Sequence, residues 1–250
     1  MKIFSTTIIF LSSVFLFAQQ TKVLWIGNSY TSVNNLPQVF YNLSLSGGDS
    51  VMFDSNAPGG YTFQNHSVNA TTIQKIQSQK WNYVVLQAQS QEPSFPPMQV
   101  QAQTMPYAHL LDSLVVDNDS CTETVFYMTW GRKYGDQSNC AGYPPLCTFT
   151  GMQARLRESY LQMANDNHAI VSAAGMAWKK SWQTDSLINL WSSDNSHPSV
   201  AGTYLTACVF YATIFRKPPI GLSYSPIGDS ATTAFLQTIA HHTVFDSLAT

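Results

Sequence analysis

The sequence is poor in charge. Only 10% of its 250 residues are Asp, Glu, Lys or Arg, against about 25% in typical soluble domains, and the formal net charge is −2. No cluster of Lys and Arg indicates a nucleic-acid surface, and no acidic run indicates a solvated tail. We therefore expect no nucleic-acid partner. A neutral surface rich in hydroxyl and amide groups suits contact with uncharged polymers such as polysaccharides, although export alone also produces such a surface.

Cysteine is also scarce, with four in the chain. None of them forms a CxxC pair or a Cys/His cluster with zinc spacing, so we predict no metal centre. Cys140 and Cys147 flank six residues that include one Gly and two Pro, and this spacing favours a disulfide over free thiols. Cys121 and Cys208 are predicted to be buried thiols.

The long apolar stretch of the chain lies at its N-terminus. Lys2 provides a positive charge, Ile3 to Phe17 is mostly apolar, and Ala18 is small enough to precede a cleavage site. The stretch is too short and too poorly flanked for a stable membrane span. We predict residues 1–18 to be a bacterial-type signal peptide, with an uncleaved anchor as the alternative. Residues 19–250 then form a single secreted or periplasmic domain.

Short apolar runs alternate with longer segments of helical periodicity along the chain. This alternation is typical of repeated βα units, and near-continuous hydrophobicity fits strands covered on both faces. We predict an α/β protein, a three-layer α/β/α sandwich around a mainly parallel sheet. The five strands are expected at Lys22–Ile26, Ser50–Asp54, Tyr83–Leu86, Thr124–Thr129 and Ala169–Ser172. Helices are expected at about 35–46, 64–79, 98–116, 151–166, 198–215 and 229–247, with a specificity loop at 131–150.

Ser29 follows the first predicted strand. The apolar run from Val23 to Ile26 stops at Gly27-Asn28-Ser29, which places a serine where a buried strand turns into a helix. Ligands bind at this edge of open parallel sheets. The backbone N–H of Ser29 and the helix dipole can stabilise an oxyanion there. Alternatively, Ser29 is an ordinary helix N-cap.

A carboxylate and an imidazole occur three residues apart near the other end of the chain, in Asp194-x-x-His197-Pro198. A neutral imidazole close to Ser29 could take its proton, while the carboxylate fixes the tautomer of the ring. Alternatively, Asp194 or Ser196 caps the helix whose start Pro198 marks. With Ser29, the pair supplies the parts of a serine hydrolase.

Four short motifs occur in a fixed order along residues 22–215, and their combination resembles the SGNH, or GDSL-like, hydrolase superfamily, in a branch of bacterial exported proteins. The resemblance implies a flavodoxin-like SGNH hydrolase fold that needs no cofactor. The motifs are Gly27-Asn28-Ser29-Tyr30-Thr31, Gly59-Gly60-Tyr61-Thr62-x-x-x-His66, Gln87-Ala88-Gln89-Ser90 and Asp194-x-x-His197-Pro198.

The resemblance also implies a role for each matching residue. Ser29 takes the place of the nucleophile, His197 that of the general base and then acid, and Asp194 that of the orienting carboxylate. Gly60 matches the glycine whose backbone N–H enters the oxyanion hole.

Two positions depart from the superfamily pattern. The third motif usually reads Gly-x-Asn-Asp, and counting from Leu86 puts Gln89 in place of the asparagine whose amide binds the oxyanion. Gln87 is the competing choice. Glutamine carries the same amide on a side chain that is one methylene longer, so its backbone must sit further back. Asn28 replaces an aspartate, which affects the support around the nucleophile.

Three further residues are candidates outside the motif roles. His66 is interpreted as a brace for the first or second motif, with substrate contact as the alternative. Trp130 follows the fourth strand and either stacks on a sugar or belongs to the core. Arg132 is placed to contact a carboxylate or phosphate.

The sequence as a whole predicts a secreted serine esterase that acts through an acyl-enzyme. Its substrate would be a small-molecule or polysaccharide ester, and the neutral surface favours O-acetyl groups on a carbohydrate. One alternative is a carbohydrate-binding or accessory protein of low activity on the same scaffold, as the glutamine in the third motif suggests. Another is a lipid esterase, which would carry an exposed apolar rim.

Overall fold

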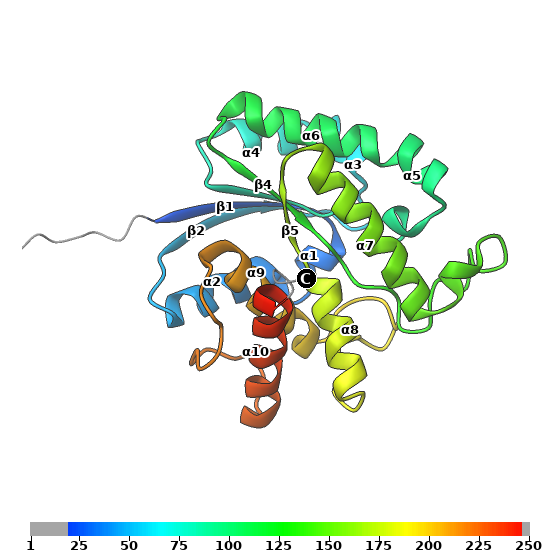
Figure 1. Ribbon diagram of the computed structural model, residues 1–250. Coiled ribbons are helices and arrows are strands. Elements are labelled where there is room, and N and C mark those ends of the chain that lie inside the picture. Colours follow the sequence, from blue (N-terminus) through cyan, green and yellow to red (C-terminus); the bar gives the residue numbers. More distant parts are fainter. Residues whose placement is uncertain (1–19, 247–250) are drawn as a thin grey trace, which may run out of the picture.

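Five short strands form the centre of the molecule in a computed structural model that describes residues 20–246. They pair in parallel in the order β2-β1-β3-β4-β5 (Figure 1). The predicted sheet is confirmed, with strand ends shifted by at most two residues, and the predicted signal peptide lies outside the described residues. The strands are β1 (Thr21–Ile26), β2 (Val51–Asn56), β3 (Tyr83–Leu86), β4 (Glu123–Tyr127) and β5 (Ile170–Ser172).

Helices cover both faces of the sheet (Figure 1). The α-helices are α1 (Ser29–Ser32), α2 (Leu36–Ser46), α3 (Phe63–Ser67), α4 (Ala70–Gln77), α5 (Pro97–Gln103), α6 (Met105–Asn118), α7 (Phe149–Asp166), α8 (Ala174–Thr184), α9 (Val200–Phe215) and α10 (Ser230–Phe245). Short 3-10 helices are η1 (Val33–Asn35), η2 (Glu92–Ser94) and η3 (Pro144–Cys147).

Alternate residues of each strand face opposite layers, so the sheet separates two apolar cores. Trp25 and Tyr127 pack on the side of α2, α8, α9 and α10. Leu24 and Phe126 pack on the side of α3, α4, α6 and α7. These two layers lie below and above the sheet in Figure 1. Burial on both faces fixes the carboxyl ends of the strands, where the candidate site lies.

Two predicted helices are each broken in two. The predicted helix at 64–79 ends after Ser67, and Asn69 starts α4 by accepting a hydrogen bond from the Thr72 N–H. The predicted helix at 98–116 breaks at Thr104, because Pro106 in the first turn of α6 has no N–H to continue the preceding helix. In both places a local start signal breaks a segment whose helical periodicity is continuous.

The helix α8 is absent from the sequence prediction. It begins directly after β5, and the residue at its N-cap position, Ala173, has no side chain that can cap it. Its first turn also contains Gly175, a residue type that disfavours helices. The structure requires a glycine there, because a Cβ would lie 2.0 Å from the Thr129 carbonyl oxygen.

The cysteines behave as predicted with one exception. Cys140 and Cys147 form the disulfide, and Cys208 is a buried thiol. The prediction that Cys121 is buried is wrong, because it lies exposed in the turn that precedes β4.

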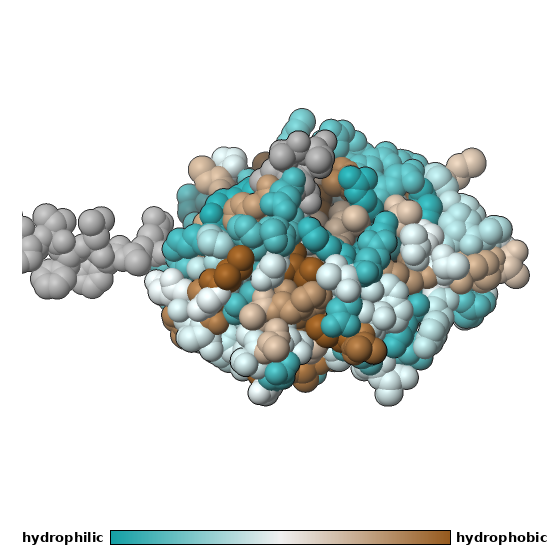
Figure 2. Space-filling view, turned by 60° about the horizontal axis from the view of Figure 1, so that its bottom comes forward, coloured by the Kyte–Doolittle hydropathy of each residue, from teal (hydrophilic) through white to brown (hydrophobic). Residues whose placement is uncertain are grey.

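The surface viewed from the side of α2, α8 and α10 carries apolar patches that are separated by hydrophilic residues (Figure 2). Among residues 20–246, no helix combines the length and the apolar character that crossing a membrane requires.

Candidate active site

The candidate site lies where the strand order changes direction. The chain passes from β1 to β2 on one side and continues through β3 to β5 on the other, so the loops after β1 and β3 diverge and open a space at the carboxyl edge. Ser29 follows β1 at this point. Where they leave the sheet, the loops after β1 and β3 are still in contact. Gly27 allows this contact, because a Cβ there would lie 2.7 Å from the Gln87 Oε1.

Asn28, and not Ser29, caps the helix after β1. The Asn28 Oδ1 accepts a hydrogen bond from the Tyr30 N–H at 3.1 Å, and Ser29 is the first residue of α1. The interpretation of Ser29 as the N-cap is therefore wrong. The Asn28 Nδ2 donates to the Tyr61 carbonyl at 2.9 Å and to the Ala88 carbonyl at 3.5 Å. Asn28 therefore joins the loops after β1, β2 and β3. An aspartate at this position has no N–H group and could not make these two hydrogen bonds.

The structure brings Ser29, His197 and Asp194 together. The His197 Nε2 lies 2.9 Å from the Ser29 Oγ. The His197 Nδ1 is hydrogen-bonded to the Asp194 Oδ2. When Nδ1–H donates to the carboxylate, Nε2 is left as an acceptor that faces the serine hydroxyl. The side chains of His197 and Asp194 are 34% and 48% exposed, so this site is open to the surface.

Asp194 organises its own loop. Its Oδ1 accepts hydrogen bonds from the Ser192 hydroxyl at 2.7 Å and from the Ser196 and His197 backbone N–H groups at 2.9 Å each. Desolvation raises the pKa of Asp194, but the hydrogen bonds from His197 and Ser192 outweigh it and hold the pKa well below its ordinary value. The N-cap of α9 is Ser199, which accepts from the Gly202 N–H, so the helix-cap interpretation of Asp194 and Ser196 is wrong.

Tyr30 and Trp130 hold Ser196, which lies between Asp194 and His197. The hydroxyls of Tyr30 and Ser196 lie 2.7 Å apart, and the Trp130 Nε1–H donates to the Ser196 carbonyl at 3.0 Å. The rings of Tyr30 and Trp130 stack at 4.8 Å between centroids. Burial raises the pKa of Tyr30 above its ordinary value, so the phenol stays protonated. The residue after Ser29 is thus tied directly to the loop that carries His197.

Loss of the Tyr30–Ser196 hydrogen bond is expected to loosen the approach of His197 to Ser29. If the site hydrolyses esters, Tyr30→Phe lowers kcat about 3- to 10-fold at unchanged KM, the effect of one hydrogen bond. Ser196→Ala gives the same loss, and the double variant gives no more than either one, because both remove the same contact. Steady-state kinetics of the three variants test this. Independent, multiplying losses would contradict a shared positioning role.

The groups predicted to bind the oxyanion lie in the loops after β2 and β3: Gly60 in the first, and Gln87 and Gln89 in the second. Gly60 is exposed, has a left-handed backbone with φ of 73°, and directly precedes Tyr61, whose carbonyl binds Asn28. Gln87 is fully buried, and its Oε1 accepts from the Asn28 N–H and the Thr31 hydroxyl. Gln87 is therefore occupied in holding the loop of Ser29.

Gln89 is the amide that remains available. Its Oε1 accepts from the Gln91 N–H at 2.7 Å and from the Glu92 N–H at 3.2 Å. Its Nε2 makes only long contacts, at 3.5 Å to the Ser90 hydroxyl and 3.3 Å to the Gln91 Oε1. The oxygen end of the amide is fixed and the donor end is weakly bound, which suits a group that donates to a ligand.

Glu92 is expected to make the free energy of unfolding depend on pH. Burial raises its pKa from 4.5 to about 7. Between these values the folded protein holds a proton that the unfolded chain releases, so stability falls as pH rises through this window. Glu92→Gln is expected to match the wild type at pH 4 and to exceed it by about 1 kcal/mol at pH 8, a difference that solvent screening limits. Urea unfolding of both proteins across pH 4–8 measures this difference. A difference in the free energy of unfolding that stays constant with pH would contradict the prediction.

His66 braces the first motif, as predicted. It is fully buried, and its Nε2 lies 2.8 Å from the Gly27 carbonyl oxygen while its Nδ1 lies 2.8 Å from the Thr72 hydroxyl. Burial lowers the pKa of His66 below its ordinary value, so the ring is neutral and links Gly27 to Thr72 through its two hydrogen bonds. Substrate contact by His66 is ruled out by this burial.

Trp130 belongs to the core. It is fully buried and stacks on Trp178 at 3.7 Å between ring centroids, so the expectation that it stacks on a sugar is wrong. Arg132 stays partly exposed, with its guanidinium 3.3 Å from the buried Asp136 carboxylate. Within the described part of the chain, no group of three or more His, Cys, Asp or Glu residues is arranged to hold a metal ion.

The parallel five-stranded sheet with helices on both faces is consistent with the SGNH, or GDSL-like, hydrolase fold, and solved structures agree. No protein-family model matches the sequence, and no curated protein sequence does. A DUF4886 family protein from Bacteroides uniformis is similar with a TM-score of 0.76 and 18% identity, over 91% of this chain and 96% of that chain.

Two further solved structures with hydrolase descriptions share the fold. An SGNH hydrolase candidate from Slackia heliotrinireducens has a TM-score of 0.63 and 24% identity, over 78% of this chain and 100% of that chain. A variant of an acetyl xylan esterase from Geobacillus stearothermophilus has a TM-score of 0.55 and 16% identity, over 83% of this chain and 97% of that chain. The chain therefore has the SGNH hydrolase fold that its motifs predict.

Proposed function

We propose that this protein is a serine esterase whose catalytic residues are Ser29, His197 and Asp194. The observation that carries the proposal is the 2.9 Å contact between the His197 Nε2 and the Ser29 Oγ, with the His197 Nδ1 on Asp194. In this order the imidazole can take the hydroxyl proton and so activate the serine as a nucleophile, while the carboxylate orients the imidazole and stabilises its charged form.

In the proposed reaction the Ser29 Oγ attacks the ester carbonyl carbon, and the His197 Nε2 takes the hydroxyl proton. The tetrahedral intermediate collapses when His197 returns this proton to the leaving alcohol, which leaves an acyl group on Ser29. Water then attacks the acyl carbon and gives a proton to His197. His197 passes this proton to the Ser29 Oγ as the bond between that oxygen and the acyl carbon breaks, which releases the acid and the free serine. Asp194 stays ionised throughout, which fits its lowered pKa, and stabilises the imidazolium.

The oxyanion of the intermediate is proposed to bind the backbone N–H groups of Ser29 and Gly60 and the amide of Gln89. Ser29 provides its N–H at the first turn of α1, where that group has no partner within the helix. Each donor of this kind contributes roughly 10²–10³ in rate. The weakly held Nε2 of Gln89 supports its inclusion.

The proposed substrate is an O-acetyl ester on a carbohydrate. The 34% and 48% exposures of His197 and Asp194 suit an ester that projects from a polymer, which a deep pocket would exclude. The low charge of the chain suits a neutral polysaccharide. We also propose that residues 1–18 direct the protein out of the cytoplasm, where such polymers occur.

A panel of esters tests this proposal. The protein is expected to release acetate from p-nitrophenyl acetate and from acetylated xylo-oligosaccharides, and to act weakly on p-nitrophenyl palmitate. Spectrophotometry and chromatographic detection of acetate measure these activities. A preference for the palmitate ester would favour a lipid esterase. Binding of oligosaccharide without release of acetate would favour an accessory protein.

A further inference from the structure

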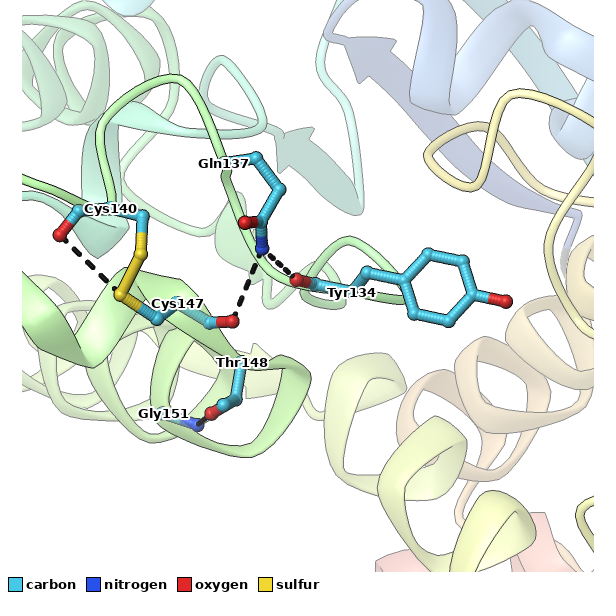
Figure 3. Close-up of a disulfide and its surroundings, with 6 residues drawn as sticks. All are labelled: Tyr134, Gln137, Cys140, Cys147, Thr148 and Gly151. Atoms are coloured by element: carbon cyan, nitrogen blue, oxygen red, sulfur yellow. Dashed lines mark hydrogen bonds between the residues drawn. A yellow bond between two sulfur atoms is a disulfide. The ribbon is translucent and has the colours of Figure 1, made fainter.

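Tyr134 is an exposed aromatic residue on the loop between β4 and α7. Its relative exposure is 61%, whereas the neighbouring Trp130 is fully buried. Tyr134 lies in a tight turn that the hydrogen bond from the Gly135 N–H to the Arg132 carbonyl closes at 2.9 Å. Its ring points away from the disulfide (Figure 3).

The loop that carries Tyr134 is held in one conformation. Gln137 donates from its Nε2 to the carbonyls of both Tyr134 and Cys147 (Figure 3), and the disulfide joins Cys147 to Cys140. Gly135 has φ of 76°, and a Cβ there would lie 2.3 Å from the Leu146 carbonyl oxygen. A loop backbone held in this way loses little freedom when a ligand stacks on Tyr134, which favours binding.

Lys133 is held beside this ring. Its ammonium lies 6.0 Å from the centroid of Tyr134, 5.3 Å from that of Trp182 and 5.8 Å from that of Trp191. It donates to the Asn189 Oδ1 at 3.1 Å, and it forms no ion pair within residues 20–246. The cation–π contacts and the Asn189 hydrogen bond position the ammonium. Asn189 takes one of its three N–H groups, so the others are left for a ligand.

Lys133 and Asn189 lie next to the loop that carries Asp194 and His197. The Lys133 backbone N–H donates to the Asn195 carbonyl at 2.9 Å, and Asn195 directly follows Asp194. Asn189 donates from its Nδ2 to the Trp191 carbonyl at 2.9 Å, just before the same loop. We call Lys133, Tyr134, Trp182 and Asn189 the Tyr134 shelf.

We propose that the Tyr134 shelf binds a sugar ring of the glycan chain that carries the ester, next to the esterified sugar. A sugar presents an apolar ring face that stacks on an aromatic side chain, and hydroxyls at its edge that bind ammonium and amide groups. The shelf offers this combination within one loop and its neighbours. A lipid chain would offer no acceptor to the Lys133 N–H groups that Asn189 does not use. The inference rests on the proposed esterase function, whose substrate it extends by one sugar.

The test compares Tyr134→Ala with Tyr134→Phe and with Met98→Ala, a control at an 86% exposed residue of α5. The measured quantity is kcat/KM for an acetylated xylo-oligosaccharide divided by kcat/KM for p-nitrophenyl acetate. Tyr134→Ala is expected to lower this ratio about 3- to 10-fold, as loss of an aromatic stack predicts, whereas Tyr134→Phe and Met98→Ala keep it. An unchanged ratio in Tyr134→Ala would overturn the proposal that the Tyr134 shelf binds a sugar.

Calorimetry separates this inference from the proposed function. In a Ser29→Ala background, the xylo-oligosaccharide is expected to bind, and Tyr134→Ala is expected to raise its Kd by the same 3- to 10-fold. If the wild type cleaves neither ester, the esterase proposal fails while this titration still decides the shelf. A Kd that Tyr134→Ala leaves unchanged, or no binding at all, would overturn the inference.

Discussion

Ser29→Ala is expected to lower kcat on p-nitrophenyl acetate by at least about 10³-fold, because the nucleophile acts as a unit with its base. The fold should survive the change. Asn28 caps α1, so the Ser29 hydroxyl contributes only its contact with the His197 Nε2. The free energy of unfolding is therefore expected to change by about 0.5 kcal/mol or less. Stopped assays at high enzyme concentration and thermal melting measure the two effects.

Ser32→Ala is the matched control for Ser29→Ala. Ser32 lies in the same short helix, is exposed and makes no side-chain capping bond, so activity should stay within twofold of the wild type. If a correctly folded Ser29→Ala variant kept activity within tenfold of the wild type, Ser29 would not be the nucleophile.

Asp194→Asn is expected to lower kcat by roughly 10³–10⁴, because an amide allows the wrong tautomer of His197 to face the serine. The Asp194 Oδ2 is the partner of the His197 Nδ1. An asparagine amide nitrogen in that place would donate to Nδ1, so Nε2 would carry the proton and could not act as the base. Asp117→Asn, at an exposed carboxylate of α6, serves as the control and should leave kcat unchanged.

The same variant has a pH signature in stability. Hydrogen bonds hold the pKa of Asp194 below its ordinary value of 3.8, so the folded protein favours the carboxylate more than the unfolded chain does. Its contribution is present above pH 4 and is lost as pH falls further. Asp194→Asn is therefore expected to melt below the wild type at pH 7, with a gap that narrows below pH 4. A gap independent of pH, with kcat reduced less than tenfold, would contradict the assigned role.

Most of the fold follows from local pattern. The three inner strands, β1, β3 and β4, contain apolar runs that are covered on both faces, so composition alone marks them. The missed features depend on single residues or on tertiary contact. Asn69 and Pro106 split segments of continuous helical periodicity, and α8 starts without a side-chain cap at Ala173. Its place is fixed by packing against Thr129, which lies far away in sequence.

The candidate site also has a part that the sequence predicts and a part that only the structure reveals. The motif order was sufficient to predict that Ser29, Asp194 and His197 come together, because each follows a strand end or precedes a helix at one edge of the sheet. The Tyr30–Ser196 contact joins residues 166 positions apart and leaves no local pattern in the sequence. Gln87 and Gln89 are alike in sequence, and only the burial of Gln87 against Asn28 separates them.

Active-site labelling tests the central claim most directly. The native protein is treated with a fluorophosphonate, digested, and mapped by mass spectrometry. The geometry of Ser29 and His197 predicts one adduct, on Ser29, that is lost on unfolding and in His197→Ala. A folded wild-type protein with no adduct, or with the adduct on another serine, would contradict the claim that Ser29 is a nucleophile activated by His197.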